Sequence, residues 1–130
     1  VEMFSTKEGE VLVNEVAPRT HNSGHHTIRA NYTSQFEQHL RAILNMPLGD
    51  TTAFMPAAMV NLLGEEGYEG HAKYVGIEEV LAIKGVFPFL YGKKITKPFR
   101  KMGHVTILGE TLEEIEEKVD YVKETLKVIA

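Results

Sequence analysis

Three patterns in the sequence predict an α+β fold in which antiparallel strands outnumber helices. Residues 1–6 and 11–16 are rich in β-favouring side chains, and Gly9 between them suits a tight hairpin turn. Residues 111–129 repeat apolar side chains in steps of three and four, which is typical of a helix that covers a sheet. Further short apolar runs bounded by glycine or proline predict strands at 56–63, 86–91 and 103–108.

The N-terminal hairpin carries the first candidate site. With Glu8 and Gly9 at the centre of the turn, the expected partners are Thr6 with Val11, Phe4 with Val13 and Glu2 with Glu15. Like charges directly opposite each other destabilise a sheet, so the Glu2 and Glu15 pair predicts either a bound cation or full exposure to water. Two carboxylates without a thiolate suit Mg²⁺ held together with phosphate groups. The alternative is an edge hairpin whose glutamates only face solvent.

The segment after the hairpin reads as a loop and two helices. Pro18 ends the strand, and 20–24 has turn chemistry before a short helix that extends through Ala30. A capping box from Ser34 to Glu37 opens a second helix that ends near Asn45.

The rest of the chain alternates strands and helices. Asn61 interrupts the apolar face of the strand at 56–63, a short helix is expected within 76–85, and a basic loop follows the strand at 86–91. Thr111 caps the last helix, whose apolar stripe is expected to join the core through Leu112, Ile115, Val119, Val122, Leu126 and Ile129.

Composition bounds the class of protein. A chain of 130 residues has about the length of one domain, and its lack of cysteine excludes disulfides and thiolate chemistry. No apolar run reaches membrane-spanning length and no secretory signal is visible, so we expect a cytoplasmic protein with no membrane partner. The net charge of -4 argues against a nucleic-acid partner. Because the chain begins in mid-strand at Val1, we expect a piece of a longer protein.

Arginine, histidine and asparagine follow the second carboxylate closely. The guanidinium of Arg19 suits an anion, and the imidazole of His21 suits the orientation or transfer of a proton. A loop histidine that is only solvated is the alternative. A zinc site made of His21, His25 and His26 is disfavoured, since no thiolate helps and further ligands are needed.

The segment Asn14–His25, NEVAPRTHNSGH, resembles the NE-x-APR-x-HNSGH motif of the ATP-grasp ligases of purine biosynthesis. It is most similar to the 5-(carboxyamino)imidazole ribonucleotide synthetases. The similarity continues through Thr33–Ala42, and further ordered blocks lie at 59–64, 90–93 and 100–104. The resemblance therefore covers nearly the whole chain.

This resemblance implies the C-terminal part of an ATP-grasp domain over 1–55 and a small β-rich subdomain with a closing helix over 56–130. The family carboxylates aminoimidazole ribonucleotide with bicarbonate through carboxyphosphate and releases ADP and phosphate. ATP and Mg²⁺ are the implied cofactors, and a homodimer is the implied assembly of the full-length protein. We expect this chain alone to be inactive. The alternative is a nucleotide-binding ATP-grasp remnant without catalysis.

The resemblance also implies residue roles. Glu2 and Glu15 bind metal, Asn14 and Glu15 serve ATP, and Arg19 and His21 are catalytic. The implied substrate-binding set comprises Arg19, His21, Asn22, Lys93, Arg100 and Lys101. Scattered surface charge is the alternative for the basic loop. That loop departs from the family's Arg-Pro-Gly-Arg-Lys at Lys97 and Phe99, and we expect Phe99 to exclude a positive φ.

Overall fold

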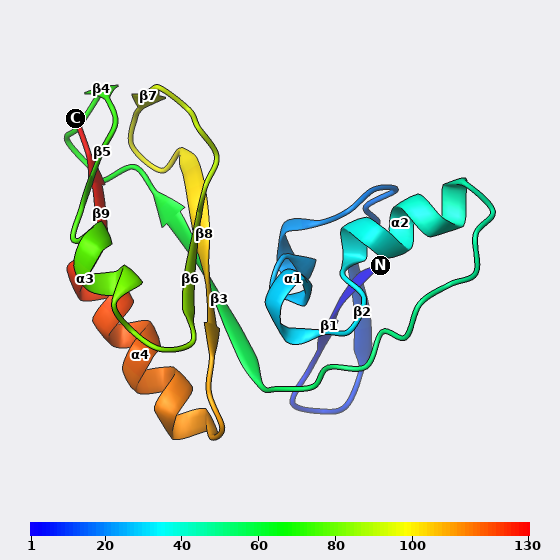
Figure 1. The fold of residues 1–130 in the computed structure, drawn as a ribbon. Coiled ribbons are helices and arrows are strands. Elements are labelled where there is room, and N and C mark those ends of the chain that lie inside the picture. The colour runs from blue at the N-terminus through cyan, green and yellow to red at the C-terminus, as the bar shows by residue number, and fades with distance from the viewer.

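In the computed structural model, which describes residues 1–130, an extended segment joins two groups of elements (Figure 1). The first group comprises β1 (Glu2–Ser5), β2 (Val11–Glu15), the 3-10 turn η1 (Asn22–Gly24), α1 (Thr27–Ala30) and α2 (Gln35–Ile43). The second comprises β3 (Ala57–Leu63), β4 (Gly70–His71), β5 (Lys73–Val75), α3 (Ile77–Leu81), β6 (Val86–Leu90), β7 (Ile95–Thr96), β8 (Lys101–Leu108), α4 (Leu112–Thr125) and β9 (Lys127–Ile129). All strand pairs within the sheets are antiparallel, as predicted.

The N-terminal hairpin forms, but its expected register is only partly right. The observed partners are Glu2 with Glu15, Met3 with Val13, Phe4 with Leu12 and Ser5 with Val11, and the register shifts between the first two pairs. The backbone N–H of Thr6 donates to the carbonyl of Glu10, so the turn holds one residue more than expected, with Gly9 at φ 85°. The shift near Asn14 offsets this extra residue and restores the opposition of Glu2 and Glu15.

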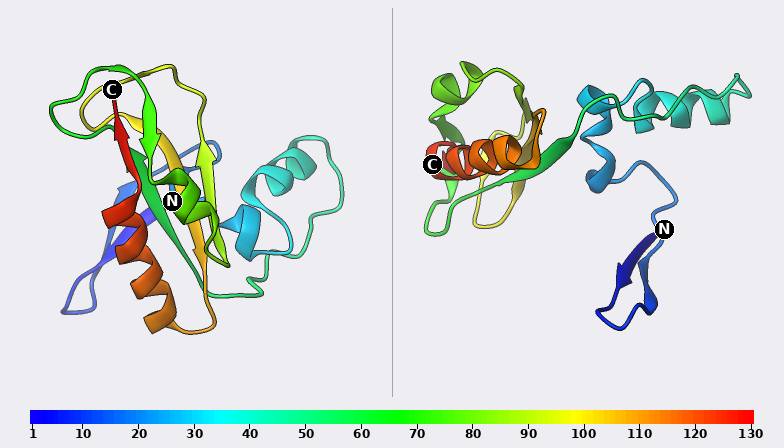
Figure 2. Two further views of the ribbon diagram at one scale, coloured as in Figure 1. Left: turned by 60° about the vertical axis from the view of Figure 1, so that its left-hand side comes forward. Right: turned by 90° about the horizontal axis from the view of Figure 1, so that it is seen from below.

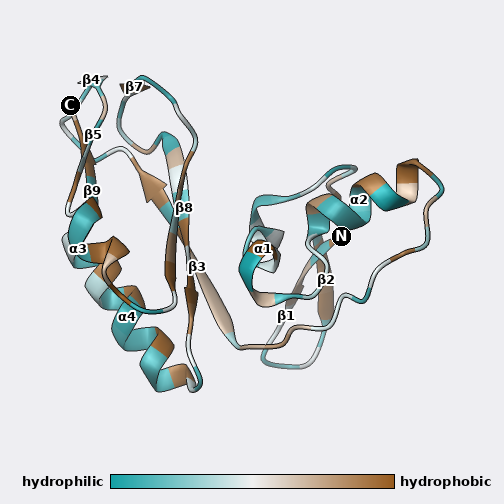
Figure 3. Ribbon diagram, viewed as in Figure 1, coloured by the Kyte–Doolittle hydropathy of each residue, from teal (hydrophilic) through white to brown (hydrophobic).

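The core lies in the second group, around the three-stranded sheet β3-β8-β6. Its central strand β8 is buried from Met102 to Leu108, and Figure 3 shows the apolar character of β8 beside the polar outer face of α4. Pro88 lies on the edge strand β6, where its missing N–H costs no ladder hydrogen bond. Val105 and Ile107 are fully buried and pack with the apolar side chains of α4.

The last predicted helix is correct at its start and too long at its end. Thr111 Oγ1 accepts from the N–H of Glu114 at 3.2 Å, as a capping residue does. The helix stops at Thr125, and 127–129 instead pair with β5 as strand β9. The expected stripe residue Ile129 therefore lies on a strand, and Leu112, at the other end of the expected stripe, is 69% exposed and does not join the core. Strands β4, β5, β7 and β9 were not predicted; each has two or three residues, too few for a periodic pattern.

Only one of the two hydrogen bonds of the expected capping box of α2 forms. Ser34 Oγ accepts from the N–H of Glu37 at 3.2 Å, whereas the Glu37 carboxylate turns to Arg41 at 2.6 Å. Asn45 follows the helix at φ 52°, a left-handed position that asparagine tolerates. No helix has both the length and the apolar character needed to cross a membrane.

A histidine pair joins the first group to the sheet. The rings of His25 and His104 lie 4.9 Å apart, and His104 also stacks on Phe89 at 4.8 Å. His104 Nδ1 lies 3.0 Å from the Tyr91 hydroxyl, while its buried Nε2 has no partner. In the right-hand view of Figure 2 the N-terminal hairpin projects away from α1 and from the sheet. The loop before α1 therefore packs against the sheet, whereas the hairpin does not.

Acid is expected to destabilise this chain between pH 6.5 and pH 4. Burial, and then the nearby His25, lower the pKa of His104 from 6.5 to about 4. The unfolded chain therefore binds a proton in this range that the folded chain does not, and the loss of stability approaches about 3 kcal/mol below pH 4. Denaturant midpoints measured across this range check the result. His104→Gln should flatten the slope and His39→Gln, at an exposed histidine, should retain it; an unchanged slope in His104→Gln would contradict the assignment.

Phe99 overturns the expectation that this residue excludes a positive φ. It adopts φ 61° and is 69% exposed, so its ring meets no steric barrier. The backbone N–H of Phe99 donates to the carbonyl of Gly64 at 2.9 Å, and the N–H of Arg100 donates to that of Lys97 at 3.1 Å. These two hydrogen bonds hold the turn against the left-handed conformational cost of about 1–2 kcal/mol.

Phe99→Gly is accordingly expected to stabilise this chain by about 1 kcal/mol, because relief of the left-handed strain exceeds the added entropy of the unfolded state. Chemical denaturation measures the change. Phe99→Ala is the matched control, since it removes the ring but keeps the strain. If glycine and alanine change the free energy of unfolding equally, backbone strain is not the cause.

Candidate functional site

The hairpin and the loop after it bring two carboxylates and an imidazole together. One ligand atom each from Glu2, Glu15 and His21 lies within 4.8 Å of the others. His21 Nε2 is 2.8 Å from Glu15 Oε1, and Asn14 Nδ2 donates to Glu2 Oε1 at 2.6 Å. The antiparallel register puts Glu2 opposite Glu15, and the chain bends at Pro18 and Arg19 before His21 contacts Glu15. We call this group the carboxylate cluster.

The local structure of the loop orients the imidazole of His21. His21 caps η1, and its Nδ1 accepts from the N–H of Ser23. Because Nδ1 accepts, the proton of neutral imidazole lies on Nε2, which then donates to Glu15. The sequence pattern identified His21 but did not indicate that it touches Glu15. Pro18 was the available signal, since proline ends the strand and redirects the chain before His21.

His25 and His26 do not join this cluster. Gln35 Nε2 lies 2.8 Å from His25 Nδ1, and His26 Nδ1 lies 2.9 Å from the carbonyl oxygen of Ser23. The three histidines of the HNSGHH segment therefore have different hydrogen-bond partners.

The basic loop reaches the HNSG turn through a single lysine. Lys101 Nζ donates to Asn22 Oδ1 at 3.2 Å, across 79 positions of sequence. Lys93 Nζ donates to the carbonyl of Lys101 at 2.6 Å, so the ammonium of Lys93 lies at the start of β8. Arg100 is separate, because its Nη1 donates to the carbonyl of Ile95 at 2.9 Å within its own loop.

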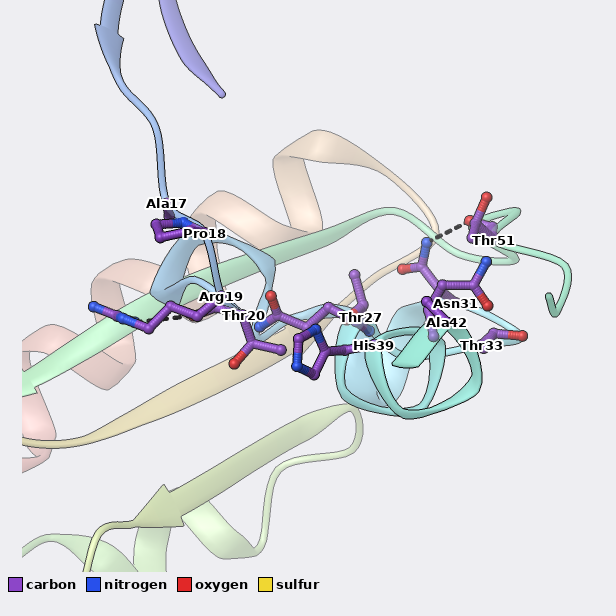
Figure 4. Close-up of a pocket in the computed structure, with 12 residues that line it drawn as sticks. Ala17, Pro18, Arg19, Thr20, Thr27, Asn31, Thr33, His39, Ala42 and Thr51 are labelled. Atoms are coloured by element: carbon purple, nitrogen blue, oxygen red, sulfur yellow. Dashed lines mark hydrogen bonds between the residues drawn. The ribbon is translucent and has the colours of Figure 1, made fainter. Parts of the chain in front are cut away.

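Arg19 makes no hydrogen bond to the carboxylate cluster. Its Nη1 donates to the carbonyl of Thr20 at 3.0 Å, and its side chain lines an open hollow of about 550 Å³ between the loop and α2. Figure 4 shows Arg19 at one end of this hollow and Thr51 at the other, with His39 between them. Arg19 and His21 are thus neighbours in sequence that face different surroundings.

Comparison with known proteins decides the family. Residues 57–118 match the model of the phosphoribosylaminoimidazole carboxylase C-terminal domain, and 1–36 match that of the ATP-grasp domain. The N5-carboxyaminoimidazole ribonucleotide synthase of Aquifex aeolicus is 48% identical over 127 residues, covering 98% of this chain and 33% of that protein. The crystal structure of the Thermotoga maritima synthetase matches with 58% identity and a TM-score of 0.94, covering 98% of this chain and 36% of that chain. The chain belongs to the N5-carboxyaminoimidazole ribonucleotide synthase family.

This synthase-family chain spans about a third of the length of those relatives. A further relative, from Aspergillus clavatus, was crystallised in complex with ADP and 5-aminoimidazole ribonucleotide. It is 33% identical with a TM-score of 0.81, covering 94% of this chain and 33% of that chain. The antiparallel α+β fold predicted from the sequence is confirmed by these structures.

The two matched regions of this synthase-family chain meet at the site. Glu2, Glu15 and His21 lie within the ATP-grasp match, and Lys93 and Lys101 lie within the C-terminal match. The hydrogen bond from Lys101 to Asn22 joins one region to the other. A ligand that contacts both Lys101 and the carboxylate cluster therefore depends on the contact between the two regions.

Proposed function

We propose that this chain is the C-terminal part of an ATP-dependent ligase that carboxylates 5-aminoimidazole ribonucleotide with bicarbonate. The observation that carries this proposal is the opposition of Glu2 and Glu15 beside His21, within a chain whose relatives bear the synthase name. A hard cation site next to a basic loop suits a reaction that takes ATP and a nucleotide monophosphate as substrates.

The carboxylate cluster fits Mg²⁺ by its donor set. Glu2 and Glu15 offer hard oxygen ligands, and Ala17 adds none, so the remaining positions are left for phosphate oxygens and water. Asn14 and His21 each donate to one of the two carboxylates and so hold them in place. When bound, Mg²⁺ neutralises charge on the transferred phosphoryl group. Asn14 and Glu15 thereby also serve ATP binding.

The residues after the cluster serve bicarbonate and its activated form. A bicarbonate oxygen attacks the γ-phosphorus of ATP, ADP leaves, and carboxyphosphate results. The amine of the ribonucleotide then attacks the carboxyphosphate carbon, phosphate leaves, and the amine loses a proton. We assign the anionic intermediate to Arg19 and Asn22, and we assign His21 to the orientation of Glu15 through its Nε2–H.

The basic loop is assigned to the ribonucleotide phosphate. Lys101 and Lys93 carry this role most directly, since Lys101 already reaches Asn22. Arg100 is the third candidate, although its guanidinium is engaged by the carbonyl of Ile95. Ammonium and guanidinium groups are suited to phosphate through charge-assisted hydrogen bonds.

Assembly, location and domain division belong to the same proposal. We infer a homodimer of the full-length protein in the cytoplasm, with no nucleic-acid or membrane partner. The boundary between the ATP-grasp part and the C-terminal subdomain is placed near residue 55, in the extended segment that precedes β3.

The decisive experiment supplies full-length protein with Mg-ATP, ¹³C-labelled bicarbonate and 5-aminoimidazole ribonucleotide. Release of ADP is expected to require both co-substrates for its full rate, and the label is expected in the carboxyamino group of the product. Binding of Mg-ATP without turnover under these conditions would instead favour a nucleotide-binding remnant.

A further inference from the structure

The side-chain amide of Gln35 grips the backbone of His21 at both of its polar groups. Gln35 Oε1 accepts from the N–H of His21 at 2.9 Å, and Gln35 Nε2 donates to the carbonyl of His21 at 2.7 Å. A backbone N–H only donates and a carbonyl only accepts, so these contacts determine which end of the amide is nitrogen. The orientation of Gln35 therefore follows from its partners.

The second N–H of the same amide determines the state of His25. Gln35 Nε2 lies 2.8 Å from His25 Nδ1, and an amide nitrogen has no lone pair to offer. His25 Nδ1 must accept, so His25 is neutral with its proton on Nε2. Burial, and then the nearby His21 and Lys101, lower the pKa of His25, which agrees with a neutral ring. His25 is held between the rings of Phe36 at 5.4 Å and His104 at 4.9 Å.

The loop is shaped so that the amide can reach His21. The N–H of Gln35 donates to Thr27 Oγ1 at 2.9 Å, and this hydroxyl donates to the carbonyl of Gly24 at 2.6 Å. A Cβ at Gly24 would lie 2.6 Å from Gln35 Oε1, so only glycine leaves room for the amide there. His21, Gly24 and His25 thus surround the amide of Gln35, and Thr27 holds its backbone N–H.

We propose that Gln35 is a positioning residue, which holds His21 against Glu15 and holds His25 as the neutral Nε2–H tautomer. The catalytic consequence rests on the proposed function, because it acts through the His21 and Glu15 pair. The tautomer of His25 does not rest on it. No hydrogen bond joins Gln35 to Glu2 or Glu15, so its effect on the two carboxylates passes through the backbone of His21.

The chain contains a matched control one turn along α2. Gln38 Oε1 accepts from the N–H of Gly49 at 2.9 Å, and Gln38 Nε2 donates to the carbonyl of Gly49 at 3.3 Å. The same residue type thus makes the same pair of contacts to a different backbone segment. Gln38→Met removes a comparable clamp without touching His21 or His25.

The first test is spectroscopic and uses full-length protein labelled with ¹⁵N-histidine, with His25 assigned by substitution. Parental protein and Gln38→Met should show His25 protonated at Nε2 only. In Gln35→Glu the new carboxylate has no proton to donate, so His25 Nδ1 should shift to the protonated range near neutral pH. If a folded Gln35→Glu variant keeps the parental His25 signals, the clamp does not set the tautomer and the proposal is overturned.

The second test is a double-mutant cycle on kcat. Gln35→Met should lower kcat by about tenfold in the parental background and leave the Michaelis constant for ATP unchanged, as loss of an orienting partner does. In a His21→Ala background the same substitution should have little further effect. Equal losses in both backgrounds would show that Gln35 acts only on stability and would overturn the positioning role. If the protein lacks the proposed activity but the tautomer responds as expected, the proposed function fails and the clamp stands.

Discussion

Glu15→Gln in the full-length protein is expected to lower kcat for ADP release by on the order of 100-fold or more, with little loss of stability. The substitution removes one hard anionic ligand from the carboxylate cluster and one charge that balances the cation. It also weakens the contact with His21, whose Nε2 now faces a neutral amide in place of a carboxylate. Glu15 is half exposed, with 52% of its side chain accessible, so the fold does not depend on its charge.

Steady-state ADP release at varied Mg²⁺ measures this effect. Glu10→Gln is the matched control, because Glu10 lies on the same hairpin, is exposed, and is remote from the cluster in the strand register. The control should retain parental turnover and Mg²⁺ dependence. Near-parental turnover by Glu15→Gln would remove Glu15 from the set of metal ligands and would leave the hairpin without its proposed role.

Lys101→Met is expected to raise the Michaelis constant for 5-aminoimidazole ribonucleotide by about 10- to 100-fold. A charge-assisted contact from an ammonium to a phosphate contributes about 1.5–3 kcal/mol, which corresponds to that range. Lys101 is chosen because its Nζ meets Asn22, whereas Arg100 donates to a carbonyl of its own loop. Arg100→Met should therefore have the smaller effect.

Initial rates at varied ribonucleotide and varied ATP separate the possible roles of the loop. Lys94→Met is the control, since Lys94 is exposed in the same basic loop and is not in the candidate site. The Michaelis constant for ATP should not change in any of these variants. A rise in the constant for ATP instead would assign the loop to the nucleotide, and parental constants throughout would leave Lys101 as surface charge.

The candidate site was only partly predictable from sequence. The opposition of Glu2 and Glu15 follows from the hairpin pattern, although the predicted register reached it by a two-residue turn and the chain reaches it by a longer turn and a bulge. The extra turn residue and the bulge each shift the register by one residue, in opposite directions. The predicted pair of Glu2 with Glu15 is therefore correct, while the predicted pairs between this pair and the turn are wrong. The contacts of Lys101 with Asn22 and of Gln35 with His21 have no sequence signal, because they join distant segments.

The sequence by itself determined the local elements of this protein. The periodicity of α4, the caps at Ser34 and Thr111, and the strands β3, β6 and β8 follow from side-chain spacing and from glycine or proline at their ends. Only the tertiary structure decided the strand β9 and the positive φ of Phe99. The apolar residues at 126–129 suit a helix or a strand equally, and pairing with β5 selects the strand. Likewise, hydrogen bonds to Gly64 and Lys97 outweigh the intrinsic preference of Phe99, because backbone partners supplied by the fold offset a local cost of about 1–2 kcal/mol.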